Sequence, residues 1–179
     1  MLTTPKERFD YAVNIILDHE GGYTNDPHDP GGETAYGITD YDINSSPKEL
    51  GLPAHLKDLT IDDAKRYYKS EWWDKYGFND ITSLPIATKI FDMAVDMGAS
   101  EAFKLVQYAL IHCGEAVVVD SILGLKTIAA INELYLFGCD GVFKEELVMQ
   151  STDFYEQIVS EKPMLKEFLP GWLARAKDK

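Results

Sequence analysis

Polar and apolar residues at the start of the chain follow the period of an amphipathic helix. The segment Thr4–Glu7 has the pattern of a capping box, and Pro5 stands at the first helical position. The apolar residues that follow recur at intervals of three and four: Phe9, Ala12, Val13, Ile16 and Leu17. Gly21 and Gly22 provide a stop signal. We therefore expect a helix that begins after Thr4 and ends at Glu20.

The helical period is lost between Tyr23 and Thr39. Prolines and glycines punctuate this stretch, with aromatic and β-branched residues between them. This composition is typical of turns and short strands. We expect a small, irregular β-hairpin lobe here.

From Thr60 onward the helical period returns. Glycines and capping residues divide the remainder into segments that we expect to be helical, at about 60–77, 85–97, 99–112, 126–136, 141–160 and 164–176. One apolar stripe, at Phe103, Val106, Gln107 and Leu110, favours core packing over ligand contact, because helical spacing explains it fully. The predicted fold class is mainly α with a small β-hairpin lobe.

Composition and charge narrow the function. The 17 basic and 30 acidic residues give a net charge of −13, which argues against nucleic acid and anionic membrane surfaces as partners. No segment has the roughly 18–20 apolar residues that a membrane-spanning helix needs, so stable membrane insertion is not expected. Cys113 and Cys139 form no CxxC pair, and idle thiols are favoured over a disulfide.

The candidate catalytic residues lie near the predicted end of the first helix in the sequence. Glu20 would lie beside carbonyls that carry partial negative charge, and partial burial would act in the same direction. Both effects favour a protonated carboxylic acid, which glycosidic cleavage needs to protonate the leaving oxygen. From these arguments alone, a glutamate at a helix end is more often solvated and inert than catalytic. This is the alternative interpretation of Glu20.

Two further residues are candidates for catalysis. If the loop folds back as a hairpin, Asp29 could face Glu20 and stabilise positive charge on the sugar, while the Thr34 hydroxyl positions water. Glu33 and Asp40 are alternatives to Asp29 as the second carboxylate. Turn formation is the structural alternative for Asp29. The histidines nearby lack HExxH spacing, and the acidic loop lacks the EF-hand pattern, so we expect no metal and no cofactor.

These residues resemble a known family. The segments Glu20-Gly21-Gly22-Tyr23 and Asp29-Pro30-Gly31-Gly32-Glu33-Thr34-Ala35-Tyr36-Gly37-Ile38 are similar to glycoside hydrolase family 108. That family comprises N-acetylmuramidases of phage endolysins and bacterial wall-remodelling enzymes, and the glutamate of its Glu-Gly-Gly-Tyr motif is essential. The resemblance implies a lysozyme-like helical fold and assigns the catalytic acid to Glu20. The spacing of Glu20, Asp29 and Thr34 also resembles the catalytic triad of another phage lysozyme family, which has one more residue before the threonine.

The second half resembles a predicted peptidoglycan-binding domain. The matching segments, in the expected order, are Val106–Leu110, Val119-Asp120, Thr127 and Gly171-Trp172-Leu173-Ala174-Arg175. The chain departs from the pattern at Asp96, where Asn is usual, at Ser121, where Gly is usual, and at Leu125-Lys126, where a Gly-Pro step is usual. We therefore expect a glycoside hydrolase region over 1–93 and a helical peptidoglycan-binding-like region over 94–179, packed with the first as one body.

A glycan groove needs aromatic faces for sugar rings. The candidates are Tyr23, Tyr36, Tyr41, Trp72 and Trp73, with Tyr76 beside them. Trp72 and Trp73 are adjacent on a helix and cannot both point the same way, so at least one of them is expected in the core. Tyr36 is the favoured groove residue.

The sequence thus predicts an endolysin-type N-acetylmuramidase that acts on peptidoglycan as a monomer. With no signal peptide apparent, it would wait in the host cytoplasm before lysis and act in the periplasm or cell wall. A lytic transglycosylase on the same bond, a non-catalytic peptidoglycan-binding module and, more remotely, a calcium-binding module are the alternatives.

Overall fold

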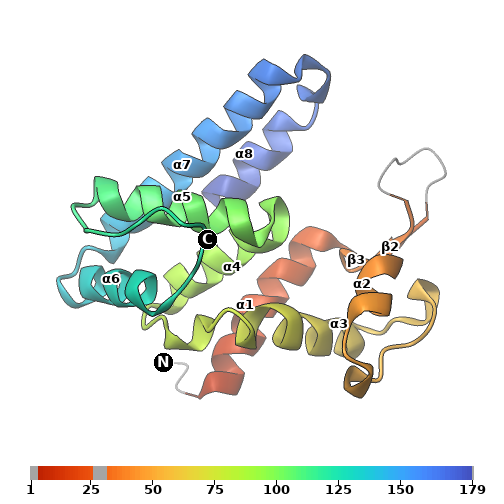
Figure 1. Cartoon of the computed structure of the whole chain (residues 1–179). Coiled ribbons are helices and arrows are strands. Elements are labelled where there is room, and N and C mark those ends of the chain that lie inside the picture. Colours follow the sequence, from red (N-terminus) through yellow and green to blue (C-terminus); the bar gives the residue numbers. More distant parts are fainter. Residues whose placement is uncertain (1–3, 26–31, 179) are drawn as a thin grey trace. The chain divides into compact units, whose positions relative to one another are not determined.

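The computed structural model describes residues 4–25 and 32–178 and divides them into two compact units, within Met1–Asn79 and Asp80–Lys179. Helices dominate both, and a small three-stranded sheet lies in the first (Figure 1). The mainly α fold with a small β lobe is therefore confirmed. The domain boundary at residue 93 stays a prediction. No helix of the described residues is both long and apolar enough to cross a membrane.

The first unit begins with α1 (Pro5–Glu20), which has the predicted ends. The Thr4 hydroxyl accepts a hydrogen bond from the Glu7 backbone N–H at 3.2 Å, and the Glu7 carboxylate accepts one from the Thr4 N–H at 3.0 Å. All five apolar residues of the predicted stripe are buried. At the other end, the Gly21 N–H donates to the Leu17 carbonyl at 3.1 Å.

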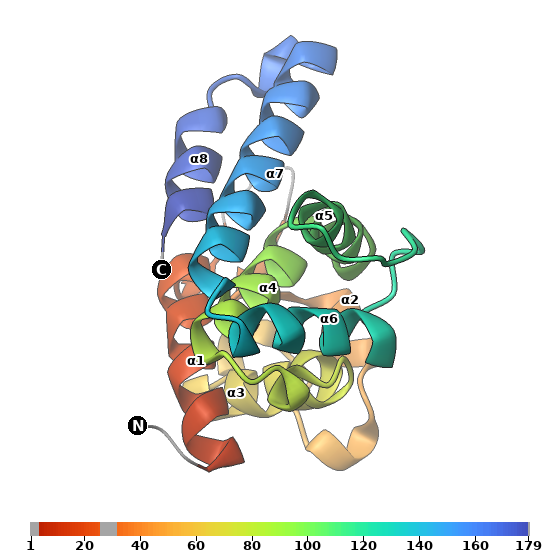
Figure 2. The same ribbon diagram turned by 90° about the vertical axis from the view of Figure 1, so that its left-hand side faces the viewer.

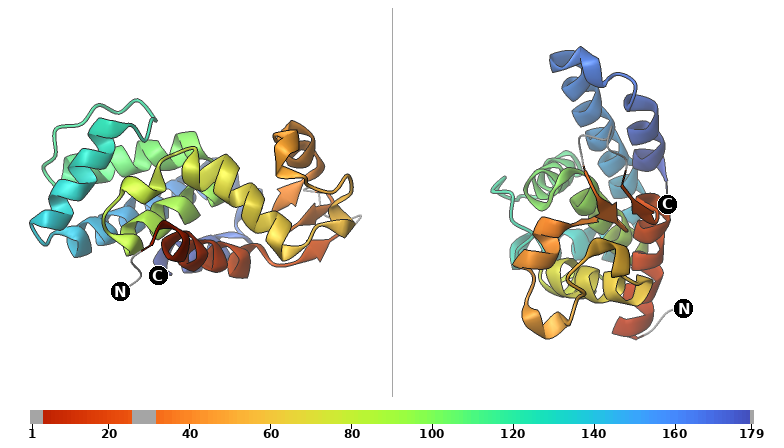
Figure 3. Two further views of the ribbon diagram at one scale, coloured as in Figure 1. Left: turned by 90° about the horizontal axis from the view of Figure 1, so that it is seen from below. Right: turned by 90° about the vertical axis from the view of Figure 1, so that its right-hand side faces the viewer.

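The predicted hairpin lobe is a sheet of three two-residue strands, β1 (Tyr23–Thr24), β2 (Thr34–Ala35) and β3 (Ile38–Thr39) (Figure 3). Both pairings are antiparallel, with Thr34 opposite Thr24 in β1 and Thr39 in β3. Strands this short cannot bury an apolar face of their own. Their position depends on the surrounding helices, to which Ala35 and Ile38 are packed without exposed surface.

The rest of the first unit is helical. Helix α2 (Asp40–Ser45) has a capping box formed by Thr39 and Asp42, and α3 (Ile61–Tyr68) has one formed by Thr60 and Asp63. Helix α3 continues into a π-helical stretch, Lys69–Asp74. Short 3-10 turns complete this unit at Lys48–Leu50, Leu56–Asp58 and Phe78–Asp80.

The second unit consists of α4 (Leu84–Met97), α5 (Ala99–His112), α6 (Leu125–Leu136), α7 (Asp140–Glu161) and α8 (Leu169–Lys177). Helices α7 and α8 lie side by side, and α5 packs on α7 (Figure 2). The stripe predicted to be core is buried, with Phe103 at 2% exposure and Val106, Gln107 and Leu110 at 0%.

One predicted helix of this unit is wrong. The segment 164–176 is not continuous, because a 3-10 turn at Pro163–Leu165 precedes α8, which starts only at Leu169. Pro170 has no N–H to donate to the preceding turn and disfavours helical geometry in the residue before it, so it belongs in a first turn. The apolar period alone indicates a helix from 164, but Pro170 restricts where the helix can begin.

A cluster of charged groups joins three helices of the second unit. Arg175 of α8 donates to Asp92 of α4 at 2.9 and 3.0 Å and pairs with Asp96 at 3.1 Å. The Tyr155 hydroxyl of α7 donates to Asp96, and the buried Lys89 amine donates to the Arg175 carbonyl at 3.0 Å. Burial lowers the pKa of Lys89. These residues form the Arg175 cluster, which ties α4, α7 and α8 together.

A second polar cluster holds the loop between α5 and α6. The buried Gln107 amide donates to Asp120 at 2.7 Å and to the Ile122 carbonyl at 3.0 Å, and its oxygen accepts from the N–H groups of Asp120 and Ser121, both at 2.9 Å. Ser121 has a φ of 63°. This left-handed conformation explains why glycine is the residue expected there. Both cysteines of this unit are unpaired, as predicted.

Candidate active site

Glu20 is the last residue of α1, and its side chain is half-buried. The chain leaves the helix through Gly21, whose φ of 73° lies in the left-handed region. A residue with a Cβ would be strained at this position. The second residue of the Glu-Gly-Gly-Tyr segment therefore allows the chain to turn directly after Glu20.

The Glu20 carboxyl group lies against the tip of the hairpin formed by β2 and β3. A Cβ added to Gly37 would lie 2.6 Å from Glu20 Oε2 and 2.9 Å from Glu20 Cδ. At these distances the Glu20 side chain would have to shift for any Cβ at position 37, so glycine lets the backbone and the carboxyl group lie in contact. This contact is the strongest geometric feature around Glu20.

The hairpin turn itself has unusual backbone geometry. Ala35 pairs with Ile38, so Tyr36 and Gly37 form a two-residue turn, and their φ angles are 54° and 75°. Positive φ at both central positions is the mark of a type I′ turn. Because Tyr36 has a Cβ, this conformation costs about 1–3 kcal/mol. Strain of this kind persists only where neighbouring contacts hold it.

Two hydrogen bonds hold the turn. The Tyr68 hydroxyl of α3, a residue 1% exposed, donates to the Tyr36 carbonyl at 2.8 Å. The Tyr36 N–H donates to the Gly22 carbonyl at 3.3 Å. The turn is thus fastened both to α3 and to the segment just after Glu20, which fixes Gly37 against the carboxyl group.

The predicted catalytic partners differ in how they can be placed. Asp29 lies outside the described residues. Thr34 is half-buried in β2, three residues before Gly37, and its role stays a prediction. Of the alternatives to Asp29, the Glu33 carboxylate accepts a hydrogen bond from the Tyr23 hydroxyl at 3.0 Å, and Asp40 is exposed at the start of α2.

A hollow of about 320 Å³ in the same unit gathers several aromatic residues. We call it the aromatic hollow, and the residues that matter here are Tyr41, Asp42, Tyr67, Glu71, Trp72 and Tyr76. The predicted groove residues Tyr41 and Trp72 are both present, and the rings of Trp72 and Tyr76 lie 6.0 Å apart. Aromatic faces beside carboxylates can stack on sugar rings and accept hydrogen bonds from hydroxyl groups.

Trp73 is a correction to the predicted groove. Its side chain is 0% exposed and packs on Phe9 and Phe78, with ring centroids 5.8 and 5.5 Å away. No face remains for a sugar, so Trp73 is a core residue. One of the two adjacent tryptophans was expected to be core, and the structure identifies which. The remaining candidates are Tyr23, which is 48% exposed, and Tyr36, which is half-buried in the turn.

Asp42, Tyr67 and Glu71 line the hollow but are not among the residues predicted for the groove. Burial, and then the nearby Asp42 carboxylate, raise the pKa of Tyr67, so its hydroxyl keeps its proton. The Asp42 carboxylate accepts from the Thr39 N–H at 2.9 Å and the Thr39 hydroxyl at 2.6 Å. The signal that could have found this residue is the Thr39–Asp42 capping box, which also marks the start of α2.

Across residues 4–25 and 32–178, no three His, Cys, Asp or Glu side chains gather in a way that could hold an ion. The chemistry that the described site offers is that of a carboxyl group at a helix end, held against a backbone turn, together with an aromatic hollow.

Comparison with known proteins now identifies the chain. Residues 13–98 match the model of the family Glycosyl hydrolase 108. This region is therefore a glycosyl hydrolase 108 domain. Residues 101–177 match the model described as Predicted Peptidoglycan domain. The protein is therefore a glycoside hydrolase that acts on peptidoglycan, with a catalytic domain followed by a peptidoglycan domain.

Solved structures support the fold. The structure of Brucella abortus SagA is similar, with a TM-score of 0.66 and 23% sequence identity, over 97% of this chain and 98% of that one. No curated protein matches the sequence. The lysozyme-like fold expected from the family resemblance is thereby confirmed.

Proposed function

We propose that this peptidoglycan hydrolase is an N-acetylmuramidase that cleaves the β-1,4 bond between N-acetylmuramic acid and N-acetylglucosamine, with Glu20 as its general acid. The observation that carries the proposal is the contact between the Glu20 carboxyl group and the backbone of Gly37. A general acid must be held in one place relative to the oxygen that it protonates. At Glu20, a helix end and a fastened hairpin turn together restrict the carboxyl group.

The aromatic hollow supports the same function. Sugar rings have apolar faces that stack on aromatic side chains, and Tyr41 and Trp72 offer such faces in the same domain as Glu20. Tyr41 is 79% exposed, so the faces of its ring are open to a ligand. We assign this hollow to the glycan strand that is cut.

The second catalytic group decides between hydrolysis and transglycosylation. In our proposal Asp29 stabilises positive charge on the sugar and Thr34 positions the attacking water, so the product is a reducing N-acetylmuramic acid end. Without an attacking water, the same acid would leave an anhydro sugar, which is the product of a lytic transglycosylase. The chemical nature of the new chain end therefore distinguishes the two reactions.

The decisive experiment compares wild type with Glu20→Gln on purified Gram-negative sacculi. Glu20→Gln keeps the shape of the side chain and removes the acid, so we expect cleavage to fall by about 10²–10⁴-fold. Asp18→Asn is the matched control, because Asp18 is an exposed carboxylate on the same helix, and it should leave the rate unchanged. Circular dichroism checks that each variant folds, and mass spectrometry identifies the released ends.

Each outcome has a distinct meaning. Reducing ends from wild type and none from a folded Glu20→Gln support the muramidase, whereas anhydro ends identify a transglycosylase. Equal cleavage by Glu20→Gln would remove Glu20 from the mechanism. The phage-endolysin role, which is part of the proposal, is tested with the same pair expressed in a Gram-negative host. Wild type should lyse the cells only after the inner membrane is permeabilised, and Glu20→Gln should not.

A further inference from the structure

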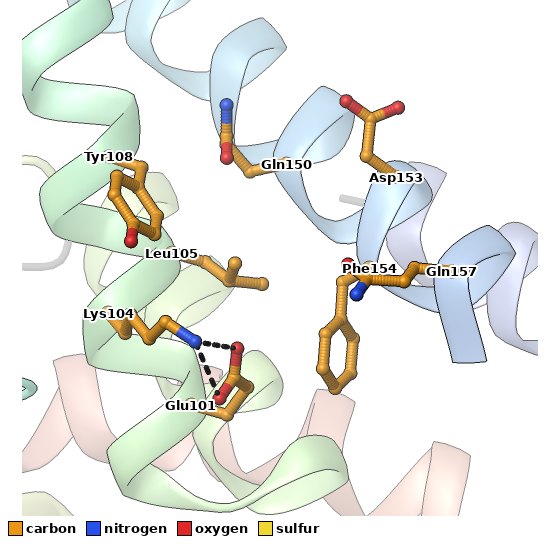
Figure 4. A pocket seen from close by; sticks show the side chains of 8 residues that line it. All are labelled: Glu101, Lys104, Leu105, Tyr108, Gln150, Asp153, Phe154 and Gln157. Atoms are coloured by element: carbon orange, nitrogen blue, oxygen red, sulfur yellow. Dashed lines mark hydrogen bonds and ion pairs between the residues drawn. The ribbon is translucent and has the colours of Figure 1, made fainter. Parts of the chain in front are cut away.

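A hollow of about 260 Å³ lies in the peptidoglycan domain, between α5 and α7. Figure 4 shows Lys104 and Tyr108 projecting from α5 and Phe154 and Gln157 from α7, with Leu105 between them. We call this the α5–α7 hollow. All of these residues lie outside the segments that resemble the family pattern, apart from Tyr108.

The lining combines ring faces with amide groups. Tyr108 is 38% exposed, and Phe154 is half-buried on the opposite helix, so both helices contribute an aromatic ring. Gln150 and Gln157 add carboxamides, which can donate to and accept from the same ligand. Ring faces with a few convergent polar groups are the usual composition of a small-ligand site.

The position of Gln150 is set by its neighbours. Its amide nitrogen donates to Glu146 at 2.9 Å and lies 3.2 Å from His112 Nδ1. Because the nitrogen is engaged there, the amide oxygen is the end that faces Tyr108 and Leu105 (Figure 4). A ligand in the hollow would thus meet a hydrogen-bond acceptor that is already oriented.

Charge decides which part of peptidoglycan fits. Lys104 is paired with Glu101 at 3.1 Å, so its charge is already neutralised, and Asp153 adds a further negative charge at the rim. The whole chain carries −13. Repulsion disfavours the carboxylates of the stem peptide, and also the lactyl carboxylate of any N-acetylmuramic acid unit that has no peptide attached. N-acetylglucosamine is the uncharged component of the polymer.

We propose that the α5–α7 hollow binds one N-acetylglucosamine unit of a glycan strand, with Tyr108 and Phe154 against the ring faces and Gln150 and Gln157 bonded to its hydroxyl or acetamido groups. This assignment rests on the peptidoglycan-acting function proposed above. It gives the second domain a separate subsite that retains the enzyme on a strand. The strong negative charge then acts as a filter that favours neutral sugars over the acidic parts of the wall.

The test uses the full chain carrying Glu20→Gln, so that no ligand is cut. Isotope-labelled protein is titrated with chitotriose, a soluble trimer of N-acetylglucosamine, and backbone amide shifts are followed by NMR. We expect residues 101–108 and 150–157 to shift. Because each amide is observed separately, binding in the α5–α7 hollow is distinguished from binding in the aromatic hollow.

Two substitutions and one control sharpen the test. Tyr108→Ala should weaken the binding reported by these amides about fivefold to tenfold through loss of one stacking contact, and Gln157→Ala about threefold through loss of one hydrogen bond. Tyr135→Ala is the matched control, because Tyr135 lies on α6 in the same domain with 41% exposure, close to the 38% of Tyr108. It should leave the affinity unchanged.

The results separate this proposal from the proposed function. Unshifted amides at 101–108 and 150–157, or equal weakening by Tyr135→Ala, would overturn the subsite. Shifts caused by a soluble stem peptide and not by chitotriose would overturn its assignment to a sugar. The titration needs no catalysis, so failure of wild type to cleave sacculi would count against the muramidase alone.

Discussion

The two compact units position their polar groups by different means. In the first unit, Glu20 is held by contact with the backbone of Gly37, in a turn with positive φ at two successive residues. In the second unit, the polar groups of the core are held by other side chains, as in the Arg175 and Gln107 clusters.

The difference concerns which substitutions each unit tolerates. A Cβ added to Gly37 would lie only 2.6 Å from Glu20 Oε2, so the first unit should be sensitive to small additions at this position. A buried cluster of charges is sensitive to the removal of one partner, because the charges that remain have lost their compensation. Addition should therefore damage the first unit, and deletion the second.

Removal of Arg175 should have the largest effect. Arg175→Ala leaves Asp92, which is 4% exposed, and the largely buried Asp96 without their cation, so we expect a loss of about 3–5 kcal/mol in the free energy of unfolding. Urea denaturation followed by circular dichroism measures this change.

The control for this prediction is Arg66→Ala. Arg66 pairs with Asp63 on the surface, and its side chain is 48% exposed, so the loss should stay within about 1 kcal/mol. Similar losses for the two variants would show that the Arg175 cluster is no more important than a surface ion pair. The second unit would then show no special sensitivity to the removal of a charged partner.

Addition of one methyl group at Gly37 should have the second-largest effect. Gly37→Ala drives a Cβ into the Glu20 carboxyl group, and a displacement of about 1 Å at a reacting group can cost on the order of 10²-fold in rate. We expect kcat on sacculi to fall by about that factor. The enzyme should remain folded.

Gly51→Ala separates the clash from backbone strain. Gly51 also has a positive φ, 59°, but an added Cβ there would meet nothing within 4 Å. Both variants should lose about 1–2 kcal/mol of stability through their left-handed backbone, yet only Gly37→Ala should lose activity. An equal fall in kcat for Gly51→Ala would mean that the contact with Glu20 is not the cause.

The smallest expected effect is a gain in stability, caused by Ser121→Gly. Among the described residues, Tyr36 and Ser121 are the non-glycine residues with positive φ, one in each domain. Ser121→Gly relieves about 1–2 kcal/mol of strain and adds about 0.5–1 kcal/mol of unfolded-state entropy, so stability should rise by about 0.5–1 kcal/mol. Ser121→Ala should give no such gain. Thermal denaturation of the three proteins tests this, and a destabilised Ser121→Gly would show that the serine side chain compensates for its conformation.

Much of the secondary structure was accessible from local patterns. Helix α1 begins and ends as predicted, because a capping box and a glycine stop signal act within a few residues of one another. Helix α5 has the predicted range, Ala99–His112. Helix α2 was not predicted, because its six residues are too few to show an apolar period. The capping box formed by Thr39 and Asp42 is the local signal that indicates this helix.

The candidate site was accessible only in part. The family resemblance singled out Glu20 and the segment containing Gly37, but no pattern in the sequence indicates that the two touch. The sequence also does not indicate which of Trp72 and Trp73 is buried. Both lie in the π-helical stretch, where the residues that face the core differ from those of a regular α-helix. The roles of Asp29 and Thr34 stay predictions.

The sequence alone determined the helical composition, the small β lobe, the family and the identity of the candidate acid, because caps, stop signals, apolar period and motif are local properties of the chain. The tertiary structure decided that Gly37 lies against Glu20, that Trp73 is core and that Arg175 joins three helices. These are contacts between residues 17 or more positions apart, or choices between adjacent residues. They depend on how whole elements pack, which local patterns do not specify.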